Sequence, residues 1–379
     1  MISFNVPPVA GKELEYISEA IQNRKICGDG PFTKKCSEWM EKRFGARKVL
    51  MTTSGTSALD LAMLLCDIQP GDEVILPSFT FSSTATAPIL CQGSLVFVDI
   101  DPRTMNIDPD LIEAAVTEKT KVLMIMHYGG ISCDMEKIME IARRHHLLVI
   151  EDAAQAVMAS YNGKALGTFG DFGCYSFHET KNYSMGEGGA ILINNPDYIE
   201  RAEILREKGT DRSKFNRGQI DKYTWVDKGD SFLPSELNTA YLYAQFEEAD
   251  RINDDRLKTW NYYAENLADL ASKGFIELPY VPEGARHNAH LFFIKTASIE
   301  ERSELISFAK ARGVQMVFHY IPLHSAPAGK KYGRFCGEDR YTSRESERLV
   351  RLPLYYGLSE EDAKKTVDVI REFYESKKR

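Results

Sequence analysis

The sequence predicts an α/β protein in which a large domain with a mainly parallel seven-stranded sheet precedes a smaller α+β domain. Two observations lead to this prediction. Between residues 46 and 195, seven short apolar segments alternate with amphipathic ones, as in a chain of β-α units. The length of 379 residues also exceeds what one ordinary hydrophobic core serves. We place the domains at residues 1–249 and 250–379.

The expected strands of the large sheet are nearly continuous apolar runs, which is typical of strands that are buried on both faces. They cover residues 48–53, 73–77, 95–100, 121–127, 147–151, 174–177 and 190–193. Amphipathic stretches at 56–66 and 134–145 predict helices between them. Residues 206–229 are polar and aperiodic and predict a long surface loop, which at this length is usually functional or disordered.

The C-terminal part shows a different pattern. A long helical stretch at 235–272, broken once, is followed by short apolar segments and further amphipathic ones. The expected strands are 275–278, 289–296 and 315–319, and the expected helices are 301–312 and 359–374. These shorter elements predict the smaller α+β domain.

Composition narrows the classes of function. A net charge of −8 argues against general binding to nucleic acid or to an anionic membrane. No run of about 18 apolar residues predicts a membrane span, and the N-terminus has no signal-peptide pattern. The seven cysteines are scattered, so we expect reduced thiols in a cytoplasmic protein and no metal site.

Three segments carry candidate chemistry, and each also has a plain structural interpretation. Residues 53–59, which include Gly55 and Thr56, form a turn of small residues before a helix; it could bind phosphate or be an ordinary helix start. Asp152 ends a buried strand in Glu-Asp-Ala-Ala-Gln, where it could face a ligand or cap a helix. Lys181 follows a strand in Ser-Phe-His-Glu-Thr-Lys-Asn, where a lone lysine is often only a surface charge.

Taken together, the three segments supply what pyridoxal 5′-phosphate (PLP) requires. Lys181 would form a Schiff base with the cofactor and carry protons as the catalytic base. Asp152 would keep the pyridine nitrogen protonated, because an opposed carboxylate favours the cation. The other expected cofactor-binding residues are a stacking aromatic ring, a partner for the phenolic oxygen and the phosphate cradle, namely Phe81, Gln155, Ser176, Gly55 and Thr56.

The order of these motifs resembles the DegT/StrS family of nucleotide-sugar aminotransferases over essentially the whole chain. The residues that carry the resemblance are Ser-Gly-Thr at 54–56, Pro-Ser-Phe-Thr-Phe at 77–81, Glu-Asp-Ala-Ala-Gln at 151–155, and the Lys181 segment with Gly-Glu-Gly-Gly at 186–189. The resemblance implies the fold-type I aspartate aminotransferase architecture. Relatives that remove a sugar hydroxyl carry His where this chain has Lys181, so a transaminase is expected.

Further stretches resemble one subgroup of that family. They lie at 4–8, 27–30, 221–225, 318–324 and 337–342. The subgroup implies transfer from L-glutamate to C-4 of dTDP-4-keto-6-deoxyglucose, giving dTDP-4-amino-4,6-dideoxygalactose for enterobacterial common antigen synthesis. The implied substrate-binding residues are His319, Tyr320, His324 and Arg212; for the first three, simple packing in a proline-containing turn stays open as the alternative. Amination at C-3, or a gluco product at C-4, stays open as an alternative.

One departure concerns the contact between subunits. Most family members have Gly-Tyr-Asn-Tyr-Arg before the long helix, and the Asn reaches the PLP phosphate of the neighbouring subunit. This chain has Gly-Asp-Ser-Phe-Leu at 229–233, so Ser231 takes the place of that Asn. The resemblance still implies a homodimer with shared sites, and Lys208, Arg212 or Arg217 in the preceding loop is expected at the sugar-nucleotide diphosphate.

Two other classes of function remain as alternatives. The chain could be a PLP-fold protein that serves as a non-catalytic sensor, although Lys181, Asp152 and Phe81 are all present. It could also bind nucleotides without PLP, in which case Lys181 would be incidental. The colour of the purified protein distinguishes this last class from the others.

Overall fold

The computed structural model describes residues 1–377, and a central eight-stranded sheet organises most of them. The strand order is β1-β9-β8-β5-β4-β2-β3-β12. β9 is antiparallel to both of its neighbours, and the remaining pairs are parallel. The strands are β1 (Lys48–Thr52), β2 (Glu73–Pro77), β3 (Ser94–Val98), β4 (Thr120–Met126), β5 (Leu148–Asp152), β8 (Phe172–Ser176), β9 (Gly189–Ile193) and β12 (Gly333–Phe335).

The seven strands predicted for this sheet are present within about two residues, and β12 is an addition. β12 comes from the C-terminal part of the chain and pairs in parallel with β3. Gly333 permits the approach, because a Cβ there would lie 2.7 Å from the Leu95 Cβ. A three-residue strand without an apolar run gives no periodic signal, so β12 was not among the seven strands predicted from the sequence.

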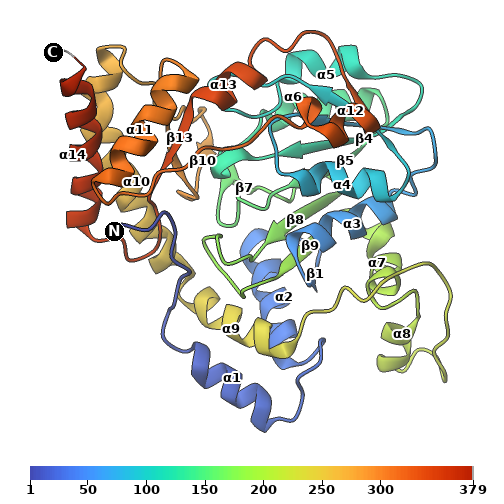
Figure 1. Ribbon diagram of the computed structural model, residues 1–379. Helices are drawn as coiled ribbons and strands as arrows, with labels where there is room; N and C mark the ends of the chain where they lie inside the picture. Colours follow the sequence, from blue (N-terminus) through green and yellow to red (C-terminus); the bar gives the residue numbers. More distant parts are fainter. Residues whose placement is uncertain (378–379) are drawn as a thin grey trace.

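Helices cover both faces of the sheet (Figure 1). Alternate strand residues point to opposite faces, so one face packs on α3 (Gly55–Leu65), α4 (Ser82–Leu90) and α7 (Ile199–Arg206). The other face packs on α2 (Pro31–Phe44), α5 (Pro109–Ala115), α6 (Met135–Arg144) and α9 (Glu236–Glu247). This three-layer arrangement is the fold expected of a PLP-dependent aminotransferase of type I.

The C-terminal residues have a hydrophobic core of their own, which supports our proposal of a smaller domain from about residue 250. It packs α10 (Ala249–Ser272), α11 (Ile299–Ala311) and α14 (Glu360–Ser376) around the antiparallel pair β11 (Phe292–Lys295) and β13 (Leu349–Leu352). The predicted break in the long helix falls at Glu248, between α9 and α10.

Two of the short strands predicted here are isolated bridges instead. Glu277 pairs with Lys295 alone, and Val317 pairs with Arg351 alone. Pro279 follows the first and Pro353 follows Arg351, and proline has no N–H group with which to extend a ladder. No helix among residues 1–377 is both long and apolar enough to cross a bilayer.

The remaining helices lie at the periphery. α1 (Glu13–Gln22) contacts α9, and the short α8 (Arg212–Asn216) interrupts the loop predicted at 206–229. Figure 1 shows α8 and its connections projecting from the edge of the large domain. Shorter elements complete the chain: η1 (Tyr128–Gly130), η2 (Pro196–Tyr198), η3 (Leu323–Ser325), α12 (Pro327–Tyr332), α13 (Thr342–Arg348), and the hairpin-like sheet of β6 (Ser160–Tyr161), β7 (Lys164–Ala165) and β10 (Ala285–Arg286).

Candidate active site

A cavity of about 790 Å³ lies at the carboxyl ends of β5 and β8. Ligands of open α/β sheets bind in this position, outside the ends of parallel strands. The start of α3 forms one wall, and residues 317–323 with β13 form another. The residues expected from the sequence that line it are Gly55, Thr56, Phe81, Asp152, Gln155, Ser176, Lys181, His319 and Tyr320.

Lys181 lies in the loop between β8 and β9, where its backbone N–H donates to the carbonyl of His178 at 2.9 Å. Its side chain is partly buried and lines the cavity. Loss of hydration lowers the pKa of the Lys181 amine to about 8, although the nearby Asp152 charge opposes this shift. A lysine with a pKa close to neutrality is prepared to act as a nucleophile and as a base.

Asp152 is buried at the last position of β5. Its Oδ2 accepts a hydrogen bond from the Thr84 hydroxyl at 2.7 Å, and its Oδ1 accepts from the Ala154 N–H at 3.2 Å. Burial raises its pKa, while the Thr84 hydrogen bond opposes that change. Because burial disfavours the ionised form of this carboxyl group, a cation placed beside it would stabilise that form.

The neighbouring Glu151 faces the opposite side of the strand and has a structural role. It accepts hydrogen bonds from the N–H groups of Gly167, Phe169 and Gly170, and its Oε2 lies 3.0 Å from His127 Nε2. Of the two acids that end this strand, only Asp152 lines the cavity.

The beginning of α3 forms a cradle of small residues. Ser54 caps the helix by accepting from the Ser57 N–H, which leaves the first helical N–H groups without helical partners. A Cβ on Gly55 would lie 2.8 Å from the Cβ of Ser176, so only glycine allows these two segments to approach so closely. Together with Thr56 and the Ser176 hydroxyl, the helix start suits a phosphate group.

Phe81, Gln155 and Tyr320 lie on the same cavity wall. The Phe81 ring is 55% exposed, and its centroid lies 6.2 Å from that of Tyr320, so one of its faces is available for stacking. Gln155 is held at both ends: its Nε2 donates to the Tyr320 hydroxyl at 2.9 Å, and its Oε1 accepts from the Gly129 N–H at 2.6 Å. The amide therefore has a fixed orientation.

The two candidate histidines of the 318–324 segment have different surroundings. His319 lines the cavity, lies 3.1 Å from the Tyr128 hydroxyl, and has a pKa far below its ordinary value because of burial. His324 does not line the cavity. Its Nδ1 lies 2.7 Å from the Ser78 hydroxyl and its Nε2 lies 3.1 Å from an Asp339 carboxylate oxygen. Both ring nitrogens therefore hold the turn, and His324 is not expected to contact the substrate.

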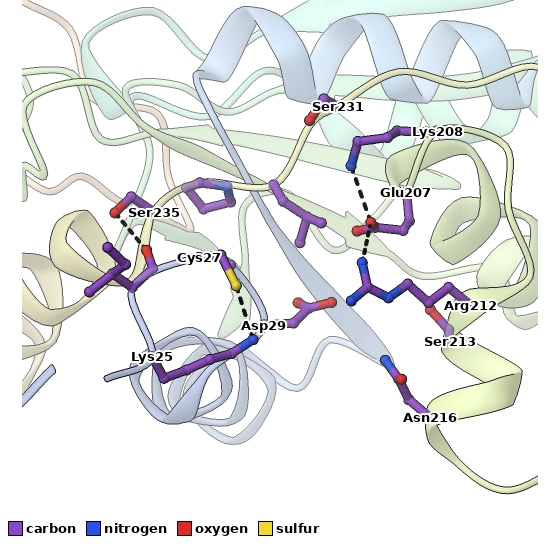
Figure 2. Close-up of a pocket in the computed structure, with 14 residues that line it drawn as sticks. Lys25, Cys27, Asp29, Glu207, Lys208, Arg212, Ser213, Asn216, Ser231 and Ser235 are labelled. Atoms are coloured by element: carbon purple, nitrogen blue, oxygen red, sulfur yellow. Dashed lines mark hydrogen bonds and ion pairs between the residues drawn. The ribbon is translucent and has the colours of Figure 1, made fainter. Parts of the chain in front are cut away.

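Ser231 and Arg212 lie in a second pocket of about 390 Å³, separate from the Lys181 cavity. Figure 2 shows Lys208 and Arg212 converging on the carboxylate of Glu207, to which they are 3.1 and 3.3 Å away. Arg217 does not line this pocket and pairs with Glu203 at 2.7 Å. Within one chain, therefore, neither Ser231 nor Arg212 reaches Lys181.

Several side chains at or beside the cavity were not predicted from the sequence. Thr84 orients Asp152, and His290 lies 2.8 Å from the Asn182 Oδ1. Arg351 comes from β13, almost at the end of the chain. No local motif marks any of these residues, because only the packing of the C-terminal part against the sheet brings His290 and Arg351 to the cavity.

Comparisons with known proteins agree with this geometry. The DegT/DnrJ/EryC1/StrS aminotransferase family matches residues 8–371. GDP-perosamine synthase of Caulobacter vibrioides is 33% identical over 378 residues, covering 97% of this chain and 96% of that protein. UDP-N-acetyl-3-dehydro-alpha-D-glucosamine 3-aminotransferase of Acidithiobacillus ferrooxidans is 34% identical over 321 residues, with coverages of 84% and 82%. The crystal structure of the aminotransferase TlmJ from Streptoalloteichus hindustanus superposes with a TM-score of 0.91 at 27% identity, covering 100% of both chains.

The chain belongs to the DegT/DnrJ/EryC1/StrS aminotransferase family. It is a PLP-dependent sugar aminotransferase, and the residues of the cavity fit that cofactor. The Gly55 cradle leaves space that a side chain would fill, Asp152 is a buried acid suited to a cation, and Lys181 has a depressed pKa. The cofactor, once bound, supplies an electron sink that withdraws charge from the reacting carbon.

The depressed pKa of Lys181 predicts how capture of PLP depends on pH. Only the neutral amine attacks an aldehyde, and a pKa of about 8 makes half of it neutral near pH 8, whereas an ordinary lysine requires pH about 10.4. The rate at which the cofactor absorbance develops in cofactor-free protein should therefore rise up to about pH 8 and then level off. A rate that continues to increase tenfold per pH unit up to pH 10, as with free Nα-acetyl-lysine, would contradict the assignment.

Proposed function

We propose that this enzyme transfers the amino group of L-glutamate to C-4 of dTDP-4-keto-6-deoxyglucose, giving dTDP-4-amino-4,6-dideoxygalactose. The observation that supports the chemistry best is the single cavity that brings together Lys181, Asp152 and the start of α3. The substrate assignment rests on the sequence stretches at 4–8, 221–225 and 318–324. A role in surface glycan synthesis, such as that of enterobacterial common antigen, follows from this product.

The position of each cavity residue suits a different task toward the cofactor. The Lys181 amine anchors the cofactor and, once released from it, takes up and returns the proton at the reacting carbon. Asp152 holds a positive charge at the ring nitrogen, since its carboxylate lies buried and is oriented by Thr84. Gly55, Thr56 and Ser176 bind the phosphate, and Phe81 stacks on the ring. The fixed amide of Gln155 is placed to bond the phenolic oxygen.

The sugar is proposed to bind at the wall that carries His319 and Tyr320. Both groups are neutral near pH 7, because burial lowers the pKa of His319 and raises that of Tyr320. Neutral donors and acceptors suit sugar hydroxyl groups, which carry no charge. We also propose a cytoplasmic location, which the seven free thiols support.

The decisive experiment for the substrate is turnover with L-glutamate and dTDP-4-keto-6-deoxyglucose, followed by NMR of the product. An axial amino group at C-4, as in the galacto configuration, is the expected result. An amino group at C-3, or an equatorial one at C-4, would replace the proposed substrate or product while leaving the enzyme class intact.

We further propose that the active enzyme is a homodimer with composite sites. In one chain, Ser231 and Arg212 lie apart from the cofactor cavity, so a second subunit is needed if they are to act there. Exposed apolar side chains support an interface between copies, since Leu14 on α1 is 83% exposed and Trp225 in the loop is 77% exposed. The pocket of Figure 2 would then open toward the partner's cofactor.

Mixed dimers test the shared site. Lys181→Ala subunits combined with Ser231→Trp subunits should regain part of the activity that each variant lacks, because one of the two sites in a mixed dimer is then undamaged. About half of the activity per mixed dimer is expected. A monomer that turns over at the normal rate, or a mixture without any recovery, would overturn the composite site but not the role of Lys181.

A further inference from the structure

Arg351 places a partly buried positive charge in the wall of the cofactor cavity. It lies on β13 and lines the same cavity as Lys181. Its Nη2 donates to the carbonyl of Phe318 at 3.0 Å, and the ring of Phe4 covers the guanidinium at 4.7 Å. Its Nε is buried and has no hydrogen-bond partner among residues 1–377.

This charge has no direct ion-pair partner among residues 1–377. No carboxylate within the described part of the chain forms an ion pair with Arg351, and the other strong base of the cavity, Lys181, is itself cationic below about pH 8. Burial lowers the pKa of Arg351, as it also lowers those of the cavity residues His290 and His319. A partly buried guanidinium that has no ion-pair partner is stabilised when an anion joins it.

A fully buried arginine shows what a purely structural role looks like in this fold. Arg256 donates from its Nε to the carbonyl of Ala289 at 3.1 Å and from its Nη2 to the carbonyl of His290 at 2.7 Å. Both ends of that guanidinium are therefore used in packing. Arg351, in contrast, keeps its Nε unpaired beside an open cavity.

We propose that Arg351 binds a carboxylate of the amino donor. This inference rests on the proposed function, in which the donor is L-glutamate. A guanidinium matches a carboxylate with two parallel N–H···O bonds, and the unpaired Nε is available for one of them. A single cation beside the aromatic ring of Phe4 suits one carboxylate better than the two phosphates of a sugar nucleotide, which carry at least two charges.

Arg351→Met tests the assignment through the two half-reactions, measured separately by the change in cofactor absorbance. Methionine keeps the length of the side chain and removes its charge. Loss of one partner of a buried charge pair costs about 2–5 kcal/mol, so the apparent Kd for L-glutamate should rise at least about 30-fold. The half-reaction with dTDP-4-keto-6-deoxyglucose should keep its apparent Kd within about threefold. Arg340→Ala removes an exposed arginine outside the cavity and should change neither value.

Two further measurements distinguish donor binding from a structural role. Glutarate, an unreactive dicarboxylate, should bind the wild-type holoenzyme in a calorimetric titration and lose at least about 30-fold in affinity with Arg351→Met, whereas Arg351→Lys should retain part of it. Thermal unfolding of Arg351→Met should occur no lower than that of the wild type, because an unpaired, partly buried charge is gone.

Several results would overturn the proposal. One is unchanged affinity for both L-glutamate and glutarate in Arg351→Met. Another is a loss confined to the sugar nucleotide, which would assign Arg351 to the diphosphate. The L-glutamate half-reaction does not involve the sugar, so an error in the proposed sugar leaves this test intact. If the wild-type enzyme does not react with L-glutamate at all, the proposed donor fails and this inference fails with it.

Discussion

Replacing Lys181 by alanine is expected to abolish transamination and the absorbance of covalently bound PLP. The variant lacks the amine that we propose as nucleophile and proton carrier, and we expect a fall in kcat of at least about 10⁴-fold. Fold and cofactor pocket should survive, because the Lys181 side chain donates no hydrogen bond to any residue within 1–377. Steady-state assays and an absorbance spectrum of the variant measure both effects.

Lys164→Ala is the matched control for this substitution. Lys164 lies on β7, outside the cavity, where its amine sits 4.6 Å from the ring of Phe169. Activity and spectrum should remain those of the wild type. Wild-type turnover by Lys181→Ala would refute the assignment of the catalytic lysine.

Asp152→Asn is expected to keep PLP bound but to slow the reaction by about 10²–10³-fold, the effect typical of removing one group that stabilises charge in a transition state. The amide is isosteric, so its oxygen still accepts from the Ala154 N–H and its NH₂ group can donate to the Thr84 hydroxyl. What disappears is the negative charge that we propose to hold a proton on the ring nitrogen. Single-turnover kinetics with L-glutamate measure the loss.

Stability provides the control for Asp152→Asn. Burial raises the pKa of this carboxyl in the folded protein, so the folded cofactor-free protein holds the proton more tightly than the unfolded chain. The contribution of the Asp152 carboxyl to the free energy of unfolding of the cofactor-free protein therefore falls as pH rises from about 4 through the pKa of this group in the folded state. Asparagine does not titrate, and the cofactor-free variant should unfold at pH 7 no lower than the wild type. If Asp152→Asn instead had wild-type kinetics and a lower unfolding temperature, Asp152 would have a structural role only.

The cofactor-facing half of the cavity was predictable because its residues belong to short, contiguous motifs. Gly55, Asp152 and Lys181 each end or follow a buried strand, and the parallel topology places such ends on one edge of the sheet. The positions of the motifs at strand ends, together with the groups that PLP requires, therefore indicated that these side chains converge. Their roles toward PLP remain predictions until the variants are measured.

The part of the cavity that the C-terminal residues contribute was not predictable in this way. Arg351 and His290 reach the cavity only because β11 and β13 pair and pack against the large domain, and this tertiary arrangement has no periodic signature. His324 shows the opposite case, since its motif allowed a sugar contact or a packing role, and in the structure Ser78 and Asp339 hold its ring outside the cavity. Sequence proximity to His319 and Tyr320 carried no information on which side chains face the cavity.

The most direct test of the account is to locate the cofactor on the chain. Holoenzyme treated with borohydride, which fixes the link between the lysine and PLP, can be digested and analysed by mass spectrometry. We expect one labelled peptide, with the pyridoxyl phosphate on Lys181, and loss of the label after prior incubation with L-glutamate. A label on any other lysine, or a label that L-glutamate does not remove, would contradict it.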